Sequence, residues 1–355
     1  MFNKLQKYHY DDEQPNLSVL LTVYNGGNYL IPAIESILCQ TFQNFELIII
    51  DDGSTDRSIE ILNHYKSIDK RIVLVSRENK GLVTTLNEAL SLARAPWVAR
   101  MDQDDICVES RFEKQIKWLE QTGADICGSW IKFFDGENSI CKYYESDEAV
   151  KFDMLFKSPF AHPTVMMRTE YARRLGYDLD FEKAEDYDLW IRAAMDNWKM
   201  GNVQEVLLHY RRHDTQMTKI SSLSTQEASA RLRARYWRYN SQKYNLNTQN
   251  VLEVQNLISS KRNTDMNSAN FAFCNLLKNS SGESRKALTD NISHLYIKAS
   301  VDIDNLSQYW RELTQNQYFV NAFSVQFKLY LISLFRLKKD TFLYSILNHF
   351  YKKIY

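Results

Sequence analysis

Residues 17–56 read LSVLLTVYNGGNYLIPAIESILCQTFQNFELIIIDDGSTD, and this stretch decides the fold. Two apolar runs, 17–23 and 46–50, each end abruptly in polar residues, and the segment 29–39 between them has helical periodicity. Such runs are typical of strands buried on both faces of a parallel sheet, which presents its ligand groups at the carboxyl ends of the strands. The polar residues expected at that edge are Tyr24, Asn25, Asp51 and Asp52.

The alternation of strand and helix continues to about residue 124, which predicts a mostly parallel α/β sheet with helices on both faces. From 125 to 213 strand and helix signals are mixed, and after about residue 220 only helix is favoured. We therefore predict an N-terminal extension at 1–16, an α/β domain at 17–220 and a helical region at 221–355. The expected later strands are 72–75, 97–101, 125–134, 164–167 and 203–210, and the expected helices are 55–66, 82–93, 109–121, 146–156, 185–197, 224–242, 247–261 and 268–279.

Composition narrows the class of protein. The 355-residue chain has a formal net charge of zero, so no global field favours nucleic acid. Its five cysteines are widely spaced without a CxxC pair, which favours reduced thiols over a disulfide framework or zinc site and indicates a cytoplasmic protein. The N-terminus lacks the apolar core of a signal peptide, and no run reaches about 18 apolar residues, so no transmembrane helix is expected.

Three carboxylates follow the predicted strand WVARM: Asp102, Asp104 and Asp105. Carboxylates this close repel one another unless a cation or solvent compensates. Mg²⁺ or Mn²⁺ bridging to a diphosphate would compensate them, since these ions favour a few carboxylates plus phosphate oxygens. The alternative is a solvated acidic loop in which Asp105 caps the following helix.

Other polar positions allow both functional and structural interpretations. Asp52 can accept hydrogen bonds from a base or sugar, or can cap a helix beginning near Thr55. Glu185 and Asp186, in KAEDYDLW, can supply a general base or can complement a helix dipole. The remaining candidates are His162, the spaced pair His209 and His213, and the basic residues Arg211 and Arg212. The chain has no GxGxxG, Walker or HExxH motif, which disfavours Rossmann dehydrogenases, P-loop NTPases and zincins.

Taken in order, these segments resemble glycosyltransferase family 2, the inverting enzymes of the GT-A fold that use nucleotide-diphosphate sugars. The resemblance covers about residues 17–216. It rests on the opening stretch, RENKGLVTTLNEAL, MDQDD, FAHPTVMMR, the ED of AEDYDLW and HYRRHDTQMT. It implies a GT-A α/β sheet followed by a helical C-terminal region outside the resemblance.

The resemblance also implies roles for particular residues. The nucleotide-sugar would be bound by Thr22, Tyr24, Asn25, Asp52, Lys80, Asp102 and Arg211. The metal ligands would be Asp104, Asp102 and His213, and the base would be Asp186, with Glu185 as the second candidate. The cofactor would be Mn²⁺ or Mg²⁺.

The implied reaction moves one sugar, from a UDP-hexose or UDP-N-acetylhexosamine, to a glycan or lipid-linked oligosaccharide in bacterial surface-polysaccharide synthesis such as that of lipopolysaccharide or capsule. Because QxxRW and transmembrane helices are absent from the sequence, a single addition is expected. A metal-dependent sugar nucleotidyltransferase, which would release pyrophosphate, and an inactive glycan-binding scaffold remain alternatives.

The end of the chain is basic and aromatic. Residues 317–355 carry six Lys and Arg against one acid, with eleven Phe and Tyr. Phe319, Phe323, Phe327, Tyr330 and Leu334 recur at helical spacing. This pattern is open to three interpretations: an aromatic face packed on the catalytic domain, a peripheral contact with an anionic cytoplasmic leaflet, or a homodimer contact.

Overall fold

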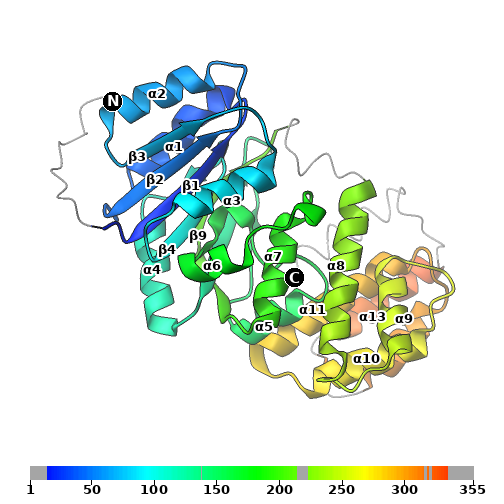
Figure 1. Ribbon diagram of the computed structural model, residues 1–355. Helices are drawn as coiled ribbons and strands as arrows, with labels where there is room; N and C mark the ends of the chain where they lie inside the picture. Colours follow the sequence, from blue (N-terminus) through cyan, green and yellow to red (C-terminus); the bar gives the residue numbers. More distant parts are fainter. Residues whose placement is uncertain (1–13, 137, 214–222, 316–317, 320–321, 335–355) are drawn as a thin grey trace. The chain divides into compact units, whose positions relative to one another are not determined.

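The computed structural model describes residues 14–136, 138–213, 223–315, 318–319 and 322–334. The chain divides into two compact units (Figure 1). The sheet unit comprises Met1–Lys142, Phe160–Glu185 and Val203–Gln216, and the helical unit comprises Tyr143–Pro159, Asp186–Asn202 and Met217–Tyr355. The domain boundaries expected near residues 16 and 220 stay predictions.

The sheet confirms the α/β class. Its described strands follow the order β3-β2-β1-β4-β8-β6-β9-β5, with β7 paired to β6. The pairs among β3, β2, β1 and β4 are parallel, whereas β8 and the strands after it pair antiparallel where the register is given. The strands are β1 (Leu17–Val23), β2 (Phe45–Asp51), β3 (Ile72–Ser76), β4 (Trp97–Met101), β5 (Ile106–Cys107), β6 (Ile126–Phe134), β7 (Ile140–Cys141), β8 (Met166–Arg168) and β9 (Met200–Arg211).

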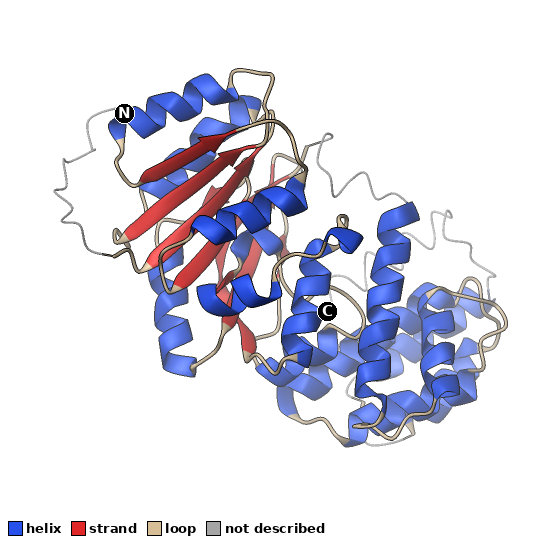
Figure 2. Ribbon diagram, in the orientation of Figure 1, coloured by secondary structure: helices blue, strands red, loops and turns tan. Residues whose placement is uncertain are grey.

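Helices cover both faces of this sheet (Figure 2). In Figure 1, α3 and α6 lie in front of the parallel strands, with α1 and α2 behind them. This follows from right-handed crossovers, because the chain moves outward from β1 to β3 and then returns across the sheet to β4. The helices of the unit are α1 (Leu30–Leu38), α2 (Ser58–Ile68), α3 (Leu82–Leu92), α4 (Arg111–Thr122) and α6 (Thr169–Leu175).

The core of the sheet unit explains why these runs are strands. All seven residues of β2 are buried, as are six of the seven in β1. A side chain on either face of β2 is therefore covered by a helix layer, which is why both parities of the strand are apolar. The return from β3 to β4 makes the gap between β1 and β4 the topological switch point, where an open α/β sheet forms its ligand crevice.

The first two helices of the sheet unit begin later than the sequence predicts. A 3₁₀ turn, Gly27–Tyr29, precedes α1, so Asn28 lies within that turn instead of capping the helix. The second helix, α2, begins at Ser58 and not near Thr55. Its expected first residues are used elsewhere: the Thr55 backbone N–H donates to Asn25 Oδ1 at 2.8 Å. These polar groups join the loops after β1 and β2.

The helical unit contains the C-terminal helices that the sequence predicts, with α5 and most of α7 inserted from earlier in the chain. Its helices are α5 (Asp147–Asp153), α7 (Glu185–Met195), α8 (Leu223–Ser241), α9 (Thr248–Ile258), α10 (Met266–Lys278), α11 (Gly282–Ala299), α12 (Leu306–Thr314) and α13 (Ala322–Leu334). Among the described helices, none combines the length and apolar character needed to cross a membrane.

The last described helix, α13, has an aliphatic face and an aromatic face. It buries Val325, Leu329 and Ile332, whereas Phe323, Phe327 and Tyr330 are 81%, 54% and 54% exposed. Within the helical unit the aliphatic face therefore packs inward, and an aromatic face packed on the catalytic domain stays a prediction. Residues 335–355 lie outside the described part of the chain.

Candidate active site

Strand register brings the predicted site residues to one edge of the sheet. Val23 pairs with Asp51, and Leu21 pairs with Met101. Because these strands are parallel and end together, the loops that begin at Tyr24, Asp52 and Asp102 leave the same edge. The switch point therefore contains the carboxylates that the sequence predicts there.

Asp52 lies in a pocket built from backbone donors and one arginine. Its carboxylate accepts the N–H of Lys80 at 2.8 Å and that of Gly81 at 3.1 Å. It also forms an ion pair with Arg77. Lys80 thus reaches Asp52 through its backbone, while its side chain is exposed. The Asp52 carboxylate is fixed at the mouth of the sheet, where it can accept a further hydrogen bond from a ligand.

Arg77 is a residue of this pocket that the sequence did not single out. Its Nε donates to Glu88 at 2.7 Å and its Nη2 to Thr85 at 2.9 Å, so the guanidinium is held in place beside Asp52. The sequence signal that could have identified Arg77 is its place as the basic residue at the start of RENKG. The turn also requires Gly53, with φ of 77°, because a Cβ there would lie 2.7 Å from the backbone nitrogen of Asn79.

In the loop after β1, one side chain is exposed and others hold the conformation of the turn. Tyr24 is 49% exposed, so its ring is available for stacking. Asn25 has φ of 50°, and its side-chain oxygen accepts from Thr55, so it shapes the turn. Thr22 is half-buried at the end of β1. Gln103 binds this loop to the acidic one: it accepts from Tyr24 N at 2.9 Å and donates to Tyr24 O at 3.0 Å.

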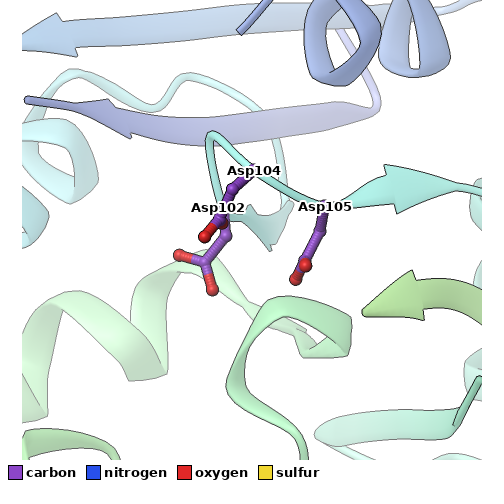
Figure 3. Close-up of side chains that lie close together, drawn as sticks. All are labelled: Asp102, Asp104 and Asp105. Atoms are coloured by element: carbon purple, nitrogen blue, oxygen red, sulfur yellow. The ribbon is translucent and has the colours of Figure 1, made fainter. Parts of the chain in front are cut away.

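The acidic loop brings Asp102, Asp104 and Asp105 together. One carboxylate oxygen from each lies within 4.8 Å of the others, and the three side chains project to the same side of the loop (Figure 3). Asp105 is only 1% exposed. Its Oδ1 accepts from the backbone N–H of Arg211 at 2.9 Å, and its Oδ2 has no hydrogen-bond partner among the described residues. Asp105 therefore does not cap the following helix, which begins at Arg111.

Buried arginines compensate only part of this charge. Burial raises the pKa of Asp102, and the ion pair with Arg100 opposes that rise. Burial and the neighbouring carboxylates Asp102 and Asp104 raise the pKa of Asp105 well above its ordinary value. A buried carboxylate oxygen without a donor is costly unless a cation reaches it. Three hard oxygen ligands with one such atom fit Mg²⁺ or Mn²⁺.

The end of β9 closes against this loop. His213 Nε2 lies 2.9 Å from Asp104 Oδ2, and Arg211 Nε donates to the Asp104 carbonyl at 2.8 Å. Arg211 also pairs with Asp135. His213 thus joins the acidic cluster as a candidate metal ligand. The role of Arg211 toward a diphosphate stays a prediction, because its described contacts are with the protein.

The candidate base lies where the chain passes from a segment of the sheet unit to a segment of the helical unit. Glu185 ends a segment of the sheet unit and is buried, whereas Asp186 begins a segment of the helical unit and is half-buried. Asp186 Oδ1 accepts the N–H of Tyr187 at 2.6 Å in the first turn of α7. The catalytic roles of Asp186 and Glu185 stay predictions.

Two other histidines are structural. His162 is buried, with Nε2 2.9 Å from the hydroxyl of Tyr177, and burial beside Arg100 lowers its pKa well below the ordinary value. His209 lies opposite Ile106 in the β5–β9 ladder, where burial lowers its pKa. His209 and His213 therefore do not share a helical face.

Comparison with known proteins gives one consistent family. The family model described as Glycosyl transferase family 2 matches residues 18–176. The chain is 35% identical over 208 residues to an uncharacterized glycosyltransferase of Methanocaldococcus jannaschii, covering 56% of this chain and 71% of that protein. It is 33% identical over 220 residues to the O-antigen biosynthesis glycosyltransferase WbnJ of Escherichia coli, covering 60% and 86%.

A further relative is the putative glycosyltransferase EpsE of Bacillus subtilis, 35% identical over 56% of this chain and 73% of that protein. Among solved structures, S. aureus TarS 1–349 in complex with UDP-GlcNAc superposes with a TM-score of 0.58 at 16% identity, covering 89% of this chain and 92% of that one. At this identity the likeness shows the fold, a GT-A sheet followed by helices.

Proposed function

The chain belongs to glycosyltransferase family 2, and from that premise we propose that it is an inverting enzyme that transfers one sugar from a UDP-sugar to a hydroxyl group. One observation carries the proposal: three carboxylates meet at the switch point of the sheet, and Asp105 Oδ2 is buried among them with no donor from the described residues. A divalent cation bound there would offset the charge of the departing diphosphate. The ligands would be Asp104 and Asp102, with His213 beside them.

The chain's own residues would bind and orient the donor. The fixed Asp52 carboxylate would accept a hydrogen bond from the base, and the exposed ring of Tyr24 would stack on it. Asp186 would take the proton of the acceptor hydroxyl as that oxygen attacks the anomeric carbon from the face opposite UDP. One bond forms while the bond to UDP breaks, so an α-linked donor gives a β-linked product.

The acceptor and the donor sugar are proposed at a coarser level. WbnJ is named for O-antigen biosynthesis, and TarS is described in complex with UDP-GlcNAc. These relatives support a UDP-hexose or UDP-N-acetylhexosamine donor and a glycan or lipid-linked oligosaccharide acceptor in surface-polysaccharide synthesis. The O-antigen role and the bound UDP-GlcNAc are properties of WbnJ and TarS, and for this chain the substrates stay proposals.

A donor screen tests the proposal. Purified protein is incubated with UDP- and GDP-sugars, with Mn²⁺, Mg²⁺ or excess chelator, and released nucleotide is measured. We expect UDP release from one or a few UDP-sugars that depends on the metal. Release of pyrophosphate would indicate a nucleotidyltransferase, and donor binding without turnover on any glycan acceptor would indicate a scaffold. Full turnover in chelator would contradict the metal site.

We also propose a peripheral contact with the anionic cytoplasmic leaflet, where a lipid-linked acceptor would lie. It is supported by the exposed aromatic residues of α13 and by the excess of six basic residues over one acid in 317–355. Aromatic and basic side chains together favour the membrane interface. Salt-sensitive co-sedimentation with anionic liposomes is the expected result. Recovery of all protein in the supernatant at low salt would contradict the membrane contact and would favour a homodimer contact through these aromatic residues.

A further inference from the structure

Tyr29 contacts two side chains from the end of β9. It is the last residue of the 3₁₀ turn before α1 and is half-buried. The guanidinium carbon of Arg211 lies 4.7 Å from the centroid of its ring. The ring of His213 stacks on it, with centroids 4.8 Å apart and an interplanar angle of 28°. One aromatic ring thus orients a guanidinium and an imidazole together.

The same two residues hold the acidic loop. Arg211 donates its backbone N–H to Asp105 and its Nε to the Asp104 carbonyl, at 2.9 and 2.8 Å. The imidazole of His213 faces the Asp104 carboxylate at 2.9 Å. Tyr29 therefore touches both side chains through which β9 reaches the cluster, although it comes from the loop after β1.

Tyr29 contacts Arg211 and His213 in different ways. Strand β9 ends at Arg211, two residues before His213. Arg211 is also covered by Phe134, at 4.5 Å, and paired with Asp135. For His213, the ring of Tyr29 is the stacking partner seen in the described part of the chain. Removing that ring would release rotation about the side-chain bonds of His213.

We propose that Tyr29 is a positioning residue of the metal site, acting through His213. Its ring sets the plane of the imidazole so that Nε2 remains directed at the Asp104 carboxylate. The inference rests on the metal site proposed above. Removing a group that orients a metal ligand typically weakens metal binding by about 10- to 100-fold, because an ordered ligand loses less freedom when the ion binds.

The test is Mn²⁺ binding to the purified protein without donor, measured as free Mn²⁺ by electron paramagnetic resonance. We expect Tyr29→Leu to weaken Mn²⁺ binding by about 10-fold, the lower end of the range for outer-shell partners. Tyr29→Phe keeps the ring and should stay within about 2-fold of the parent. The matched control is Phe133→Leu, which removes a ring from Arg212 and Tyr210 near the same end of β9.

A double-mutant cycle identifies the route of the effect. If Tyr29 acts through His213, adding Tyr29→Leu to His213→Ala weakens Mn²⁺ binding no further than His213→Ala alone. Additive losses would overturn the inference, and so would parental affinity in Tyr29→Leu or an equal loss in Phe133→Leu. These results would leave UDP release by the parent, and hence the proposed function, intact. Absence of Mn²⁺ binding by the parent would instead overturn both this inference and the metal site.

Discussion

Buried carboxylates have different surroundings in the two units. In the helical unit, Asp188 is fully buried, and its two oxygens accept from Arg192 Nε at 2.6 Å and Arg235 Nη1 at 3.1 Å. In the sheet unit, Asp105 is equally buried, but one of its oxygens has no donor within the described part of the chain, and two further carboxylates lie beside it. The described residues compensate the first carboxylate at both oxygens, and the second at only one.

This difference separates residues that stabilise the fold from residues that bind a ligand. A compensated buried charge loses stability when its partner is removed, since the remaining charge is left alone. An uncompensated charge already weakens the folded state and persists where a ligand supplies the missing interaction. Substitutions in the two groups should therefore change different measurements.

The largest expected effect sets Asp186 against Asp188 on the same helix. Asp186→Asn removes the proposed base without changing size, so we expect the transfer rate to fall by about 10²–10⁴ while donor affinity and the melting temperature are kept. Asp188→Leu leaves two arginines without their carboxylate and should cost about 3–5 kcal/mol of stability. Steady-state kinetics and calorimetry distinguish the two. Transfer at the parental rate by Asp186→Asn would make Glu185 the next candidate.

The second prediction compares Asp104 with Asp69. Asp104→Ala removes a proposed ligand and should weaken Mn²⁺ binding by at least about 10²-fold, the upper end of the range for outer-shell residues. Asp69 is instead paired with Arg71 at 2.6 Å, which lowers its pKa. Asp69→Asn should reduce stability and leave Mn²⁺ affinity unchanged. Calorimetric titration with Mn²⁺ gives the affinities. An equal loss of Mn²⁺ affinity in both variants would contradict a specific ligand role for Asp104.

The smallest expected effect concerns a buried cation in the helical unit. Burial lowers the pKa of Lys328 on α13 from 10.5 to about 8. Between these values the unfolded chain still binds the proton that the folded chain has lost, so stability should rise as pH increases from about 8 to 10.5. Lys328→Met should abolish this rise and raise the melting temperature at pH 7 by a few degrees.

Scanning calorimetry at pH 7 and pH 9.5 measures the Lys328 effect. Lys286→Met is the matched control, because Lys286 is an exposed lysine paired with Asp290. It should leave the pH dependence as in the parent. If stability rises with pH equally in Lys328→Met and in the parent, groups other than Lys328 cause the pH dependence.

The sequence predicts the sheet well because its signals are local. The fully apolar β2 and the polar residues after β1, β2 and β4 are visible in the chain itself, and parallel strands bring them to one edge. The two-residue strand β5 was missed because so short a segment has no periodicity. Arg77 and Tyr29 were missed because their contacts depend on distant residues: Arg77 on Asp52 and Tyr29 on the end of β9.

Helix α13 shows a different limit. Phe323, Phe327 and Tyr330 recur at helical spacing, and so do Val325, Leu329 and Ile332. Both sets are apolar, so periodicity alone does not decide which one faces inward. In the helical unit the smaller, aliphatic set is the one that is buried.

Gln103 stands between Asp102 and Asp104 in the MDQDD motif and forms hydrogen bonds with both backbone groups of Tyr24. The loop that would meet the nucleotide base and the loop that would meet the ion are thus joined by one side chain. If binding of the ion orders these two loops, the nucleotide then binds to loops that are already ordered and does not bear that free-energy cost. Each ligand should then raise the affinity of the other by the same factor, as thermodynamic reciprocity requires. The amide of Gln103, between two carboxylates, would thereby couple binding of the proposed donor to binding of the proposed cation.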